Sequence, residues 1–501
     1  MIRTALFLHR WLGVPLCVLF AVWFASGIGM MYWDFPEVTR GDRLARSPAL
    51  DARAVAVSPQ QAFDALHLGQ APDDARLGTF DGRPVYRFRA GGAEHVVYAD
   101  SGERRGAASP ALMRRVAARW AGRREEDAAI EPVERVDQWT VQGPLRTLRP
   151  LWKYAWPGGR QVYVAQSTGE VVQYTTRASR AGAYLGPIPH WLYFTPLRSR
   201  PAQWSAVVIW SSGAGTIAAI LGLAIGVTRY SPSKRYSLGA SATSIPYRGQ
   251  KRWHMILGLL FGIGAATWAF SGMLSMDPFP AVSGDEEREQ AARIDAALRG
   301  EIDLAAFERK PPRAALGELA GSSIKELELT SFDGRAAYVA AVDGGPTRVV
   351  PVDGAPLAEF DRDRITRIVA DAARPAAADA HVVDRYDAYY RDRRRERPLP
   401  VLRVDLDDPF RARYYIDPKT ARVVGSYSSR AWTTRWLYHG LHSLDFPWLY
   451  EHRPAWDIVV ITFMLAGTAL SATSIVLAWR VVARRAGAPD ARATPAPARD
   501  G

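Results

Sequence analysis

Uncharged, apolar residues are concentrated in four windows of this chain, and the segments between them are rich in arginine, aspartate and glutamate. Each window is long enough to cross the roughly 30 Å hydrocarbon layer of a bilayer, which takes about 20 helical residues. The pattern predicts four transmembrane helices. The windows run from about Trp11 to Trp33, Trp204 to Thr228, Trp253 to Met276 and Ala455 to Trp479.

The short flanks of these windows predict the orientation of the helices. Arginine and lysine are frequent before the first window, between the second and the third, and after the fourth. These flanks lie on one side if the helices alternate, and their positive charge marks that side as cytoplasmic. Both termini are then expected in the cytoplasm, and the long segments of about residues 34–200 and 277–450 outside it.

The chain also contains an internal repeat. Residues 245 to 252 positions apart match in the same order along both halves. Each half then contains a helix, a soluble segment and a second helix, so the halves form parallel repeats about an axis along the membrane normal. Equivalent residues are expected at equal depth. The matched pairs include His9 and His254, Gly13 and Gly258, Ser26 and Ser271, His190 and His442, and Trp204 and Trp456.

Both soluble segments combine helical and strand patterns. Ser58 precedes a proline and a helically spaced apolar stretch, which is typical of a helix N-cap. Alternating apolar residues predict strands at 83–89 and 95–98, followed by a turn. A further hairpin at 161–172 has a counterpart at 413–424. These patterns indicate α+β domains.

The sequence therefore predicts an integral membrane α-helical protein with four transmembrane helices, a parallel internal repeat and two extracytoplasmic α+β domains. The tail, with its alternating Ala, Pro, Arg and Asp, is expected to be disordered. The expected boundaries are 1–33 for helix 1 with its cytoplasmic N-terminus, 34–185 for the first extracytoplasmic domain, 186–230 for an interfacial segment and helix 2, 231–250 for a cytoplasmic loop, 251–276 for helix 3, 277–430 for the second domain, 431–482 for an interfacial segment and helix 4, and 483–501 for the tail.

Composition excludes several classes of function. The net charge of +13 would suit nucleic acid, but no helix-turn-helix, zinc finger or aromatic-interleaved basic stripe is present, so no nucleic-acid partner is expected. The single cysteine, Cys17, excludes intramolecular disulfides and thiolate metal clusters. No Ser-His-Asp grouping, phosphate loop or H-E-x-x-H motif appears, and we expect no acid, base or nucleophile.

Histidine in or against a membrane is costly and usually functional. His9 and His254 stand at the cytoplasmic ends of the first and third windows, and the repeat places them at one depth on opposite sides of a pseudo-twofold axis. Two such imidazoles can bind one iron from its two faces, and Gly13 and Gly258, one turn inward, leave room for a flat macrocycle. The pair predicts a haem site. The alternative is that both histidines are interfacial side chains that extend toward water.

A second pair, His190 and His442, belongs to the extracytoplasmic face. Each stands fourteen residues before the opening tryptophan of a window, in an aromatic, amphipathic flank that suits the membrane interface. A second haem there would take His190 and His442, and His439 competes because it lies one turn before His442. The alternative is an aromatic belt with incidental histidines. Two haems of the b type are expected, since the chain has no Cys-x-x-Cys-His motif.

These residues resemble the PepSY-associated transmembrane family. The resemblance covers nearly the whole chain except the C-terminal tail. The first repeat has one histidine where the second has two, which leaves the identity of the outer ligand open. The resemblance rests on His9-Arg-Trp-Leu-Gly13, the module from Ser58 to Gly102 with its sister strands, the run His439-Gly-Leu-His442, the strand 397–403 and Arg453-Pro-Ala-Trp-Asp457.

The resemblance implies a bacterial inner-membrane protein with PepSY-like periplasmic domains. Some members of the family are haem proteins that reduce iron(III) in periplasmic ferric siderophores, and haem ligation at His9, His254, His190 and His442 carries over to this chain. It implies an oxidoreductase that takes electrons from a quinol or a reductase, with a ferric siderophore and membrane lipid as partners. The alternative is a non-enzymatic PepSY membrane protein that binds or regulates an extracytoplasmic partner such as a protease.

The segment from Asp384 to Arg397 concentrates cations and tyrosines in the second extracytoplasmic domain. A basic aromatic surface would suit the docking of a bulky, anionic ferric siderophore. The alternative is a solvated, charged loop. The residues of this expected substrate site are Tyr386, Tyr389, Tyr390, Arg393, Arg394 and Arg395.

Overall fold

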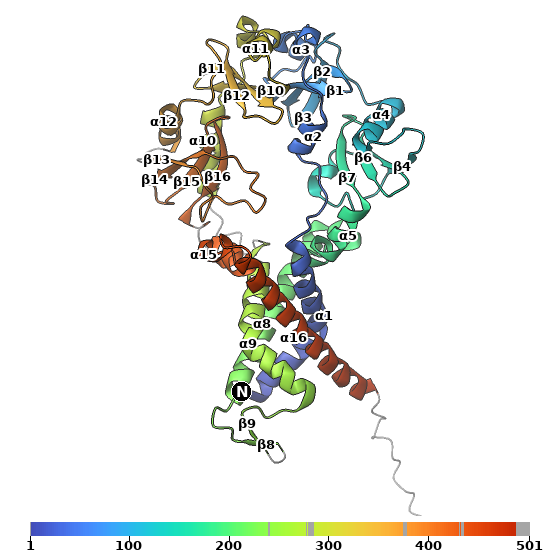
Figure 1. Ribbon diagram of the computed structural model, residues 1–501, viewed down its shortest axis with the longest axis vertical. Helices are drawn as coiled ribbons and strands as arrows, with labels where there is room; N and C mark the ends of the chain where they lie inside the picture. Colours follow the sequence, from blue (N-terminus) through green and yellow to red (C-terminus); the bar gives the residue numbers. More distant parts are fainter. Residues whose placement is uncertain are drawn as a thin grey trace, which may run out of the picture. The chain divides into compact units, whose positions relative to one another are not determined.

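A computed structural model of the chain describes residues 2–238, 241–276, 278, 285–373, 378–429, 431 and 435–486. The chain forms two compact units, which we call the helical unit and the sheet unit (Figure 1). The helical unit comprises Met1–Phe35, Ala178–Pro280 and Thr434–Gly501, and the sheet unit comprises Pro36–Arg177 and Ala281–Thr433. Each unit thus takes residues from both halves of the sequence repeat.

Four long helices build the helical unit, and each is long and apolar enough to cross a membrane. This confirms the four helices predicted from hydropathy. Three of them begin earlier than their apolar windows, so that His9, which stands before the first window, lies inside a helix, as His254 does. The helices are α1 (Ile2–Met30), α8 (Pro201–Arg229), α9 (Gly249–Leu274) and α16 (Ala455–Ala486).

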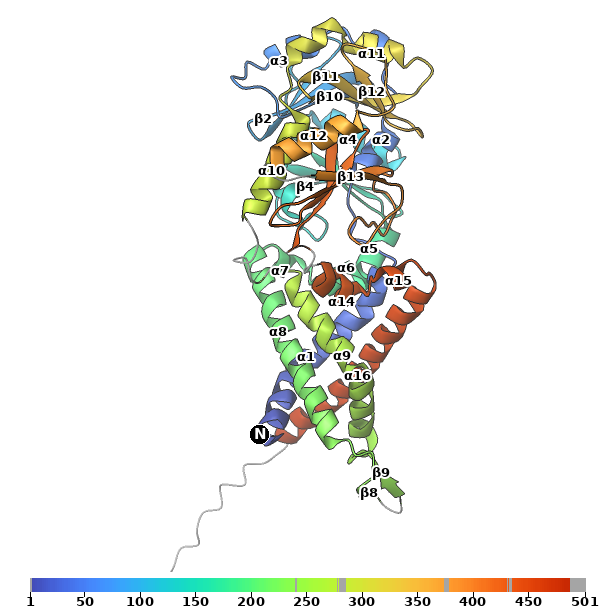
Figure 2. The same cartoon turned by 90° about the vertical axis from the view of Figure 1, so that its left-hand side faces the viewer.

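The four helices form a bundle in which α1 and α9 each pack against both α8 and α16 (Figure 2). Glycine allows close approach at several crossings. A Cβ on Gly215 would lie 3.0 Å from the Phe20 ring, and one on Gly262 would lie 3.0 Å from Leu223. The order around the bundle is therefore α1, α8, α9 and α16, which puts the first helix of each repeat at opposite corners.

Short helices precede the second long helix of each repeat. Pro187 occupies the first turn of α6, where its missing N–H leaves no bond unmade. Gly29 of α1 and Gly186 touch through their backbones, so a Cβ on either residue would clash. The elements are α5 (Arg177–Leu185), α6 (Pro187–His190) and α7 (Thr195–Arg198) in the first repeat, η5 (Arg435–Gly440), α14 (Leu441–Ser443) and α15 (Pro447–Tyr450) in the second, and the hairpin β8 (Tyr236–Leu238) and β9 (Ser241–Thr243).

The sheet unit contains three antiparallel sheets. The largest has six strands in the order β12-β11-β10-β1-β2-β3, with β1 (Asp74–Phe80), β2 (Arg83–Ala90), β3 (Ala93–Tyr98), β10 (Ile324–Phe332), β11 (Arg335–Val342) and β12 (Arg348–Pro351). The second is β4 (Ala129–Val133), β5 (Leu151–Ala155), β6 (Gln161–Ala165) and β7 (Val171–Thr175). The third is β13 (Ala378–Val383), β14 (Val401–Leu406), β15 (Arg413–Asp417) and β16 (Arg422–Tyr427).

The six-stranded sheet joins the two repeats at its centre. Strands β1 and β10 pair there, and Arg76 lies directly opposite Glu328. These two residues are 252 positions apart, the same offset that relates the repeats, so the pseudo-twofold axis passes between them. The two soluble segments therefore share one sheet, whereas the sequence analysis placed a separate domain in each.

One face of this sheet carries a core that both repeats build. Tyr86, Phe88, Leu327 and Tyr338 are fully buried there under short helices. Ser58 caps α3 as predicted, because its Oγ accepts a hydrogen bond from the Gln61 amide. The covering elements are η1 (Ala52–Ala54), α3 (Pro59–Asp64), η4 (Leu304–Arg309) and α11 (Pro312–Glu318).

The opposite face of the sheet differs between the repeats. In the second repeat α10 presses Ile294 and Leu298, both fully buried, against apolar residues of β11 and β12. In the first repeat only the outer part of the face is apolar, around Phe80, Val85 and Val96. The covering helices are α2 (Arg40–Arg46), α4 (Pro110–Ala121), α10 (Asp285–Arg299) and α12 (Arg362–Ala373), with η2 (Gly143–Arg146) beside the second sheet.

Candidate functional site

His9 of α1 and His254 of α9 meet inside the bundle, with their ring centroids 6.1 Å apart and their planes at 44°. The His9 Nδ1 atom lies 2.8 Å from the carbonyl oxygen of Ala218 on α8. The His254 Nδ1 atom lies 3.2 Å from the Thr473 hydroxyl on α16. Each ring is thus oriented by the second long helix of its own repeat.

A glycine on α8 makes room for the His9 ring. A Cβ on Gly222 would lie 2.6 Å from His9 Cε1, which is closer than side chains approach. An offset of 252 places Ser474 at the equivalent position on α16, where its Oγ lies 3.3 Å from His254 Nδ1. The two repeats therefore hold their inner histidines with different residues at one place.

His190 of α6 and His442 of α14 form a second pair, with ring centroids 6.0 Å apart and planes at 65°. The Ser26 hydroxyl lies 3.2 Å from His190 Nδ1, and the Ser271 hydroxyl lies 3.0 Å from His442 Nδ1. Each serine donates its own proton to a backbone carbonyl one turn earlier on its helix. The two serines that the sequence repeat had matched therefore orient the rings of the outer pair.

The hydrogen bonds determine which ring nitrogen carries the proton. Carbonyl oxygens only accept, and the hydroxyls of Ser26, Ser271 and Thr473 already donate to carbonyls. Each of the four Nδ1 atoms must then be the N–H donor, so that Nε2 carries the lone pair. A histidine that binds a metal through Nε2 has its Nδ1–H held in this way.

Burial keeps the outer pair neutral. It lowers the pKa of His190 to about 4. Burial, assisted by the neighbouring His190 ring, lowers the pKa of His442 to about 3. Both imidazoles are therefore uncharged at neutral pH, which is the form that binds metal.

The structure distinguishes the two histidines that competed for the outer site. His442 is the partner of His190, whereas His439 is exposed and its ring lies 4.5 Å from that of Tyr438. Gly13 and Gly258 border open space: a Cβ on Gly13 would meet no heavy atom of the described residues within 4 Å, and one on Gly258 would meet only Leu470, at 3.9 Å.

The spacing of both pairs fits a shared metal ion. Two imidazoles that bind one ion from opposite sides, each through a nitrogen about 2 Å away, have ring centroids about 6 Å apart. Trp268 Nε1 is buried in the bundle without a hydrogen-bond partner among the described residues, so a bound group could satisfy it. No group of three or more His, Cys, Asp or Glu suited to a metal occurs in the described part of the chain.

Comparison with models of known protein families finds no match, and comparison with curated proteins finds no significant match either. The resemblance to the PepSY-associated transmembrane family therefore rests on the motifs alone.

The expected substrate site divides in two. Tyr390 is fully buried, stacks on Tyr415 at 4.8 Å and donates its hydroxyl to the Pro398 carbonyl. It is a core residue, because the polar loop folds back over it. Tyr386 and Tyr389 are half-buried in the same cluster, with Tyr386 donating to the Arg397 carbonyl. Of the six, the exposed residues are Arg393, Arg394 and Arg395.

Sequence reasoning missed the residues that hold the histidines. Ser26 and Ser271 were matched by the repeat but were given no role. The signal in the sequence was that both are polar residues in otherwise apolar helices and stand at equivalent positions of the two repeats. Gly222 and Ser474 carried no such signal, because their side chains differ between the repeats.

Proposed function

We propose that this chain is a di-haem electron-transfer protein of the bacterial inner membrane that reduces iron(III) in periplasmic ferric siderophores. The observation that supports this proposal is the presence of two histidine pairs. Each pair takes one histidine from each repeat, and its ring centroids are close to 6 Å apart. Histidines that merely extended toward water would not be held by a contact at Nδ1, and they would not face a second histidine at the same distance in both pairs.

Four residues would hold the two haems of the b type. His9 and His254 hold the inner one and His190 and His442 the outer one, with their Nδ1 atoms fixed by the bonds described above. Haem bound there would supply reversible one-electron chemistry, with these histidines as its protein ligands. The protein sets the orientation, burial and separation of the two sites.

The two sites would lie on one line through the bundle. His9 and Ser26 are 17 residues apart on α1, as are His254 and Ser271 on α9, and 17 helical residues span about 25 Å. Aromatic side chains fill the core between them and exclude water. Phe24 lies 5.8 Å from Phe20 and from Trp268, and Trp268 lies 6.0 Å from Phe463.

The chemistry asks for no acid, base or nucleophile. Hard oxygen donors hold iron(III) firmly, and one added electron gives iron(II), which the same donors hold poorly. A quinol or a reductase would supply the electron on the cytoplasmic side, and the siderophore would accept it on the periplasmic side. The N- and C-termini are then cytoplasmic and the sheet unit is periplasmic.

Purification of the full chain in detergent tests the proposal. We expect a bis-histidine, low-spin b-type spectrum and two haems per chain by the pyridine haemochrome method. His442→Ala should remove one of them, and His439→Ala, the matched control one turn away, should remove none. A colourless protein would refute the proposal and favour the alternative, a PepSY membrane protein that binds an extracytoplasmic partner.

A further inference from the structure

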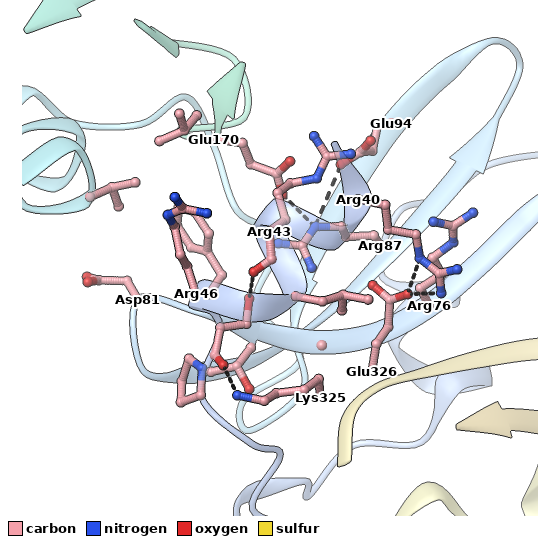
Figure 3. Close-up of a pocket in the computed structure, with 18 of the residues that line it drawn as sticks. Arg40, Arg43, Arg46, Arg76, Asp81, Arg87, Glu94, Glu170, Lys325 and Glu326 are labelled. Carbon is pink, nitrogen blue, oxygen red and sulfur yellow. Dashed lines mark hydrogen bonds and ion pairs between the residues drawn. The ribbon is translucent and has the colours of Figure 1, made fainter. Parts of the chain in front are cut away.

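The sheet unit contains a cavity of about 330 Å³ beside α2 and the first strands of the six-stranded sheet (Figure 3). Eight basic and five acidic residues line it. Arg43 and Arg46 of α2 and Arg87 of β2 line it (Figure 3), as does Arg89, which also belongs to β2. The cavity therefore carries an excess of positive charge.

Each of the five acidic residues that line this cavity lies within ion-pair distance of an arginine. Arg87 Nε lies 2.6 Å from Glu170, and Arg40 pairs with Glu326 at 2.5 Å. Burial, together with the neighbouring Glu170 carboxylate, raises the pKa of the Glu94 carboxyl. Arg43 and Arg89 are exposed to the cavity side, and neither has a carboxylate within ion-pair distance in the part of the chain that the structure describes.

Another cation, Arg105, lies next to a residue that lines the cavity. The Arg105 guanidinium lies 4.3 Å from the centre of the Phe80 ring, which lines the cavity. All three of its nitrogens are buried and have no hydrogen-bond partner among the described residues. Burial lowers the pKa of this group, which means that its charge is poorly compensated. Nearby anionic charge would offset that cost.

The second repeat has apolar side chains at the equivalent place of the sheet. An offset of 252 places Val339 at the position of Arg87 and Ala341 at that of Arg89. Val339 belongs to an apolar core that α10 closes with Ile294 and Leu298. Apolar side chains can thus pack on this face of the sheet. The fold therefore does not require arginines at the equivalent positions of the first repeat.

We propose that this cavity binds a small, multivalent oxyanion with two or more carboxylate or phosphate groups. Guanidinium groups bind such groups through paired hydrogen bonds, and unpaired Arg43 and Arg89 are the residues available to do so. A monovalent anion would leave one of them unmatched. This site is separate from the histidine pairs and does not depend on haem.

Calorimetric binding to the full chain in detergent, at low salt in chloride buffer, tests the site. We expect citrate or inorganic pyrophosphate to bind and acetate not to bind measurably. The double variant Arg43→Ala/Arg89→Ala should weaken binding by roughly tenfold or more, because it removes the two guanidinium groups that would form charged hydrogen bonds with the anion. The control Arg53→Ala/Arg114→Ala removes the same charge from exposed positions outside the cavity and should change binding less than twofold, about the scale of long-range screened charge.

The two probes distinguish the sources of the ligand. Tighter binding of citrate identifies a carboxylate ligand, and tighter binding of pyrophosphate identifies a phosphate ligand. Thermal unfolding without added anion checks that both double variants are folded. The proposal is overturned if neither probe binds the unaltered chain, or if both double variants weaken binding equally.

Discussion

The two repeats of this chain agree in the helical unit and diverge in the sheet unit. In the bundle, both repeats keep the histidines at 9 and 254 and the serines at 26 and 271, although Gly222 and Ser474 differ. In the sheet, Val339 of β11 stands at the position equivalent to Arg87 of β2, although these two strands occupy equivalent places on either side of the central β1–β10 pair. A site that lies on the axis needs one ligand from each repeat, whereas a cavity beside the axis needs only one repeat.

The covering helices explain the divergence in the sheet unit. The helix α2 has seven residues, none of them buried, and it brings arginines to the sheet. The helix α10 has 15 residues and buries Ile294 and Leu298 completely. Apolar burial drives the longer helix onto the sheet, while the short polar helix leaves a cavity open.

The largest effect is expected when one histidine of the inner pair is replaced. His9→Ala and His254→Ala should each abolish the same haem, because one imidazole alone leaves an axial position without its ligand, and both should spare the outer haem. Haem stoichiometry and low-temperature spectra measure this. Loss of different haems in the two variants would show that the histidines do not share an ion.

A smaller effect, on the stability of the protein, should distinguish the covering helices α10 and α2. Leu298→Ala removes a fully buried side chain and should destabilise the protein by about 2–5 kcal/mol, because it leaves a cavity in the core. Arg43→Ala removes an exposed side chain and should change stability by less than about 0.5 kcal/mol. The lowering of the thermal midpoint measures both. Equal shifts would mean that α2 is as firmly packed as α10.

Hydropathy predicted the helical unit well, because a bilayer demands about 20 apolar residues per crossing whatever the partner. The repeat predicted which histidines pair, since equivalent residues share a depth. It did not predict the shared sheet, because β1 and β10 lie about 250 residues apart and local patterns carry no information on such pairing.

The repeat also favoured His442 over His439 as the partner of His190, because only His442 has an equivalent histidine in the first repeat, and the ring of His442 lies 6.0 Å from that of His190. The burial of one tyrosine lay beyond the sequence for a physical reason. Tyr390 stands in a run of charged residues, yet it is buried because the loop closes over it. The arginine spacing of α2, at positions 40, 43 and 46, does mark one helical face, and it was the available signal for the cavity.

The smallest expected effect tests whether the outer pair is as symmetric as it looks. Ser26→Ala and Ser271→Ala each remove the hydroxyl that lies next to a ligand Nδ1, at 3.2 Å from His190 and 3.0 Å from His442. Loss of such a partner weakens metal binding by about tenfold or somewhat more. Because the serines are equivalent, the two variants should lose outer haem to a similar degree, and the inner haem should be unchanged. Ser275→Ala is the matched control, since that hydroxyl donates to the Gly272 carbonyl at 2.7 Å. Titration of haem into the purified apoproteins measures the affinities. A loss confined to one of the two serine variants would show that a single repeat holds the outer site, and the agreement between the repeats in the bundle would then be structural rather than functional.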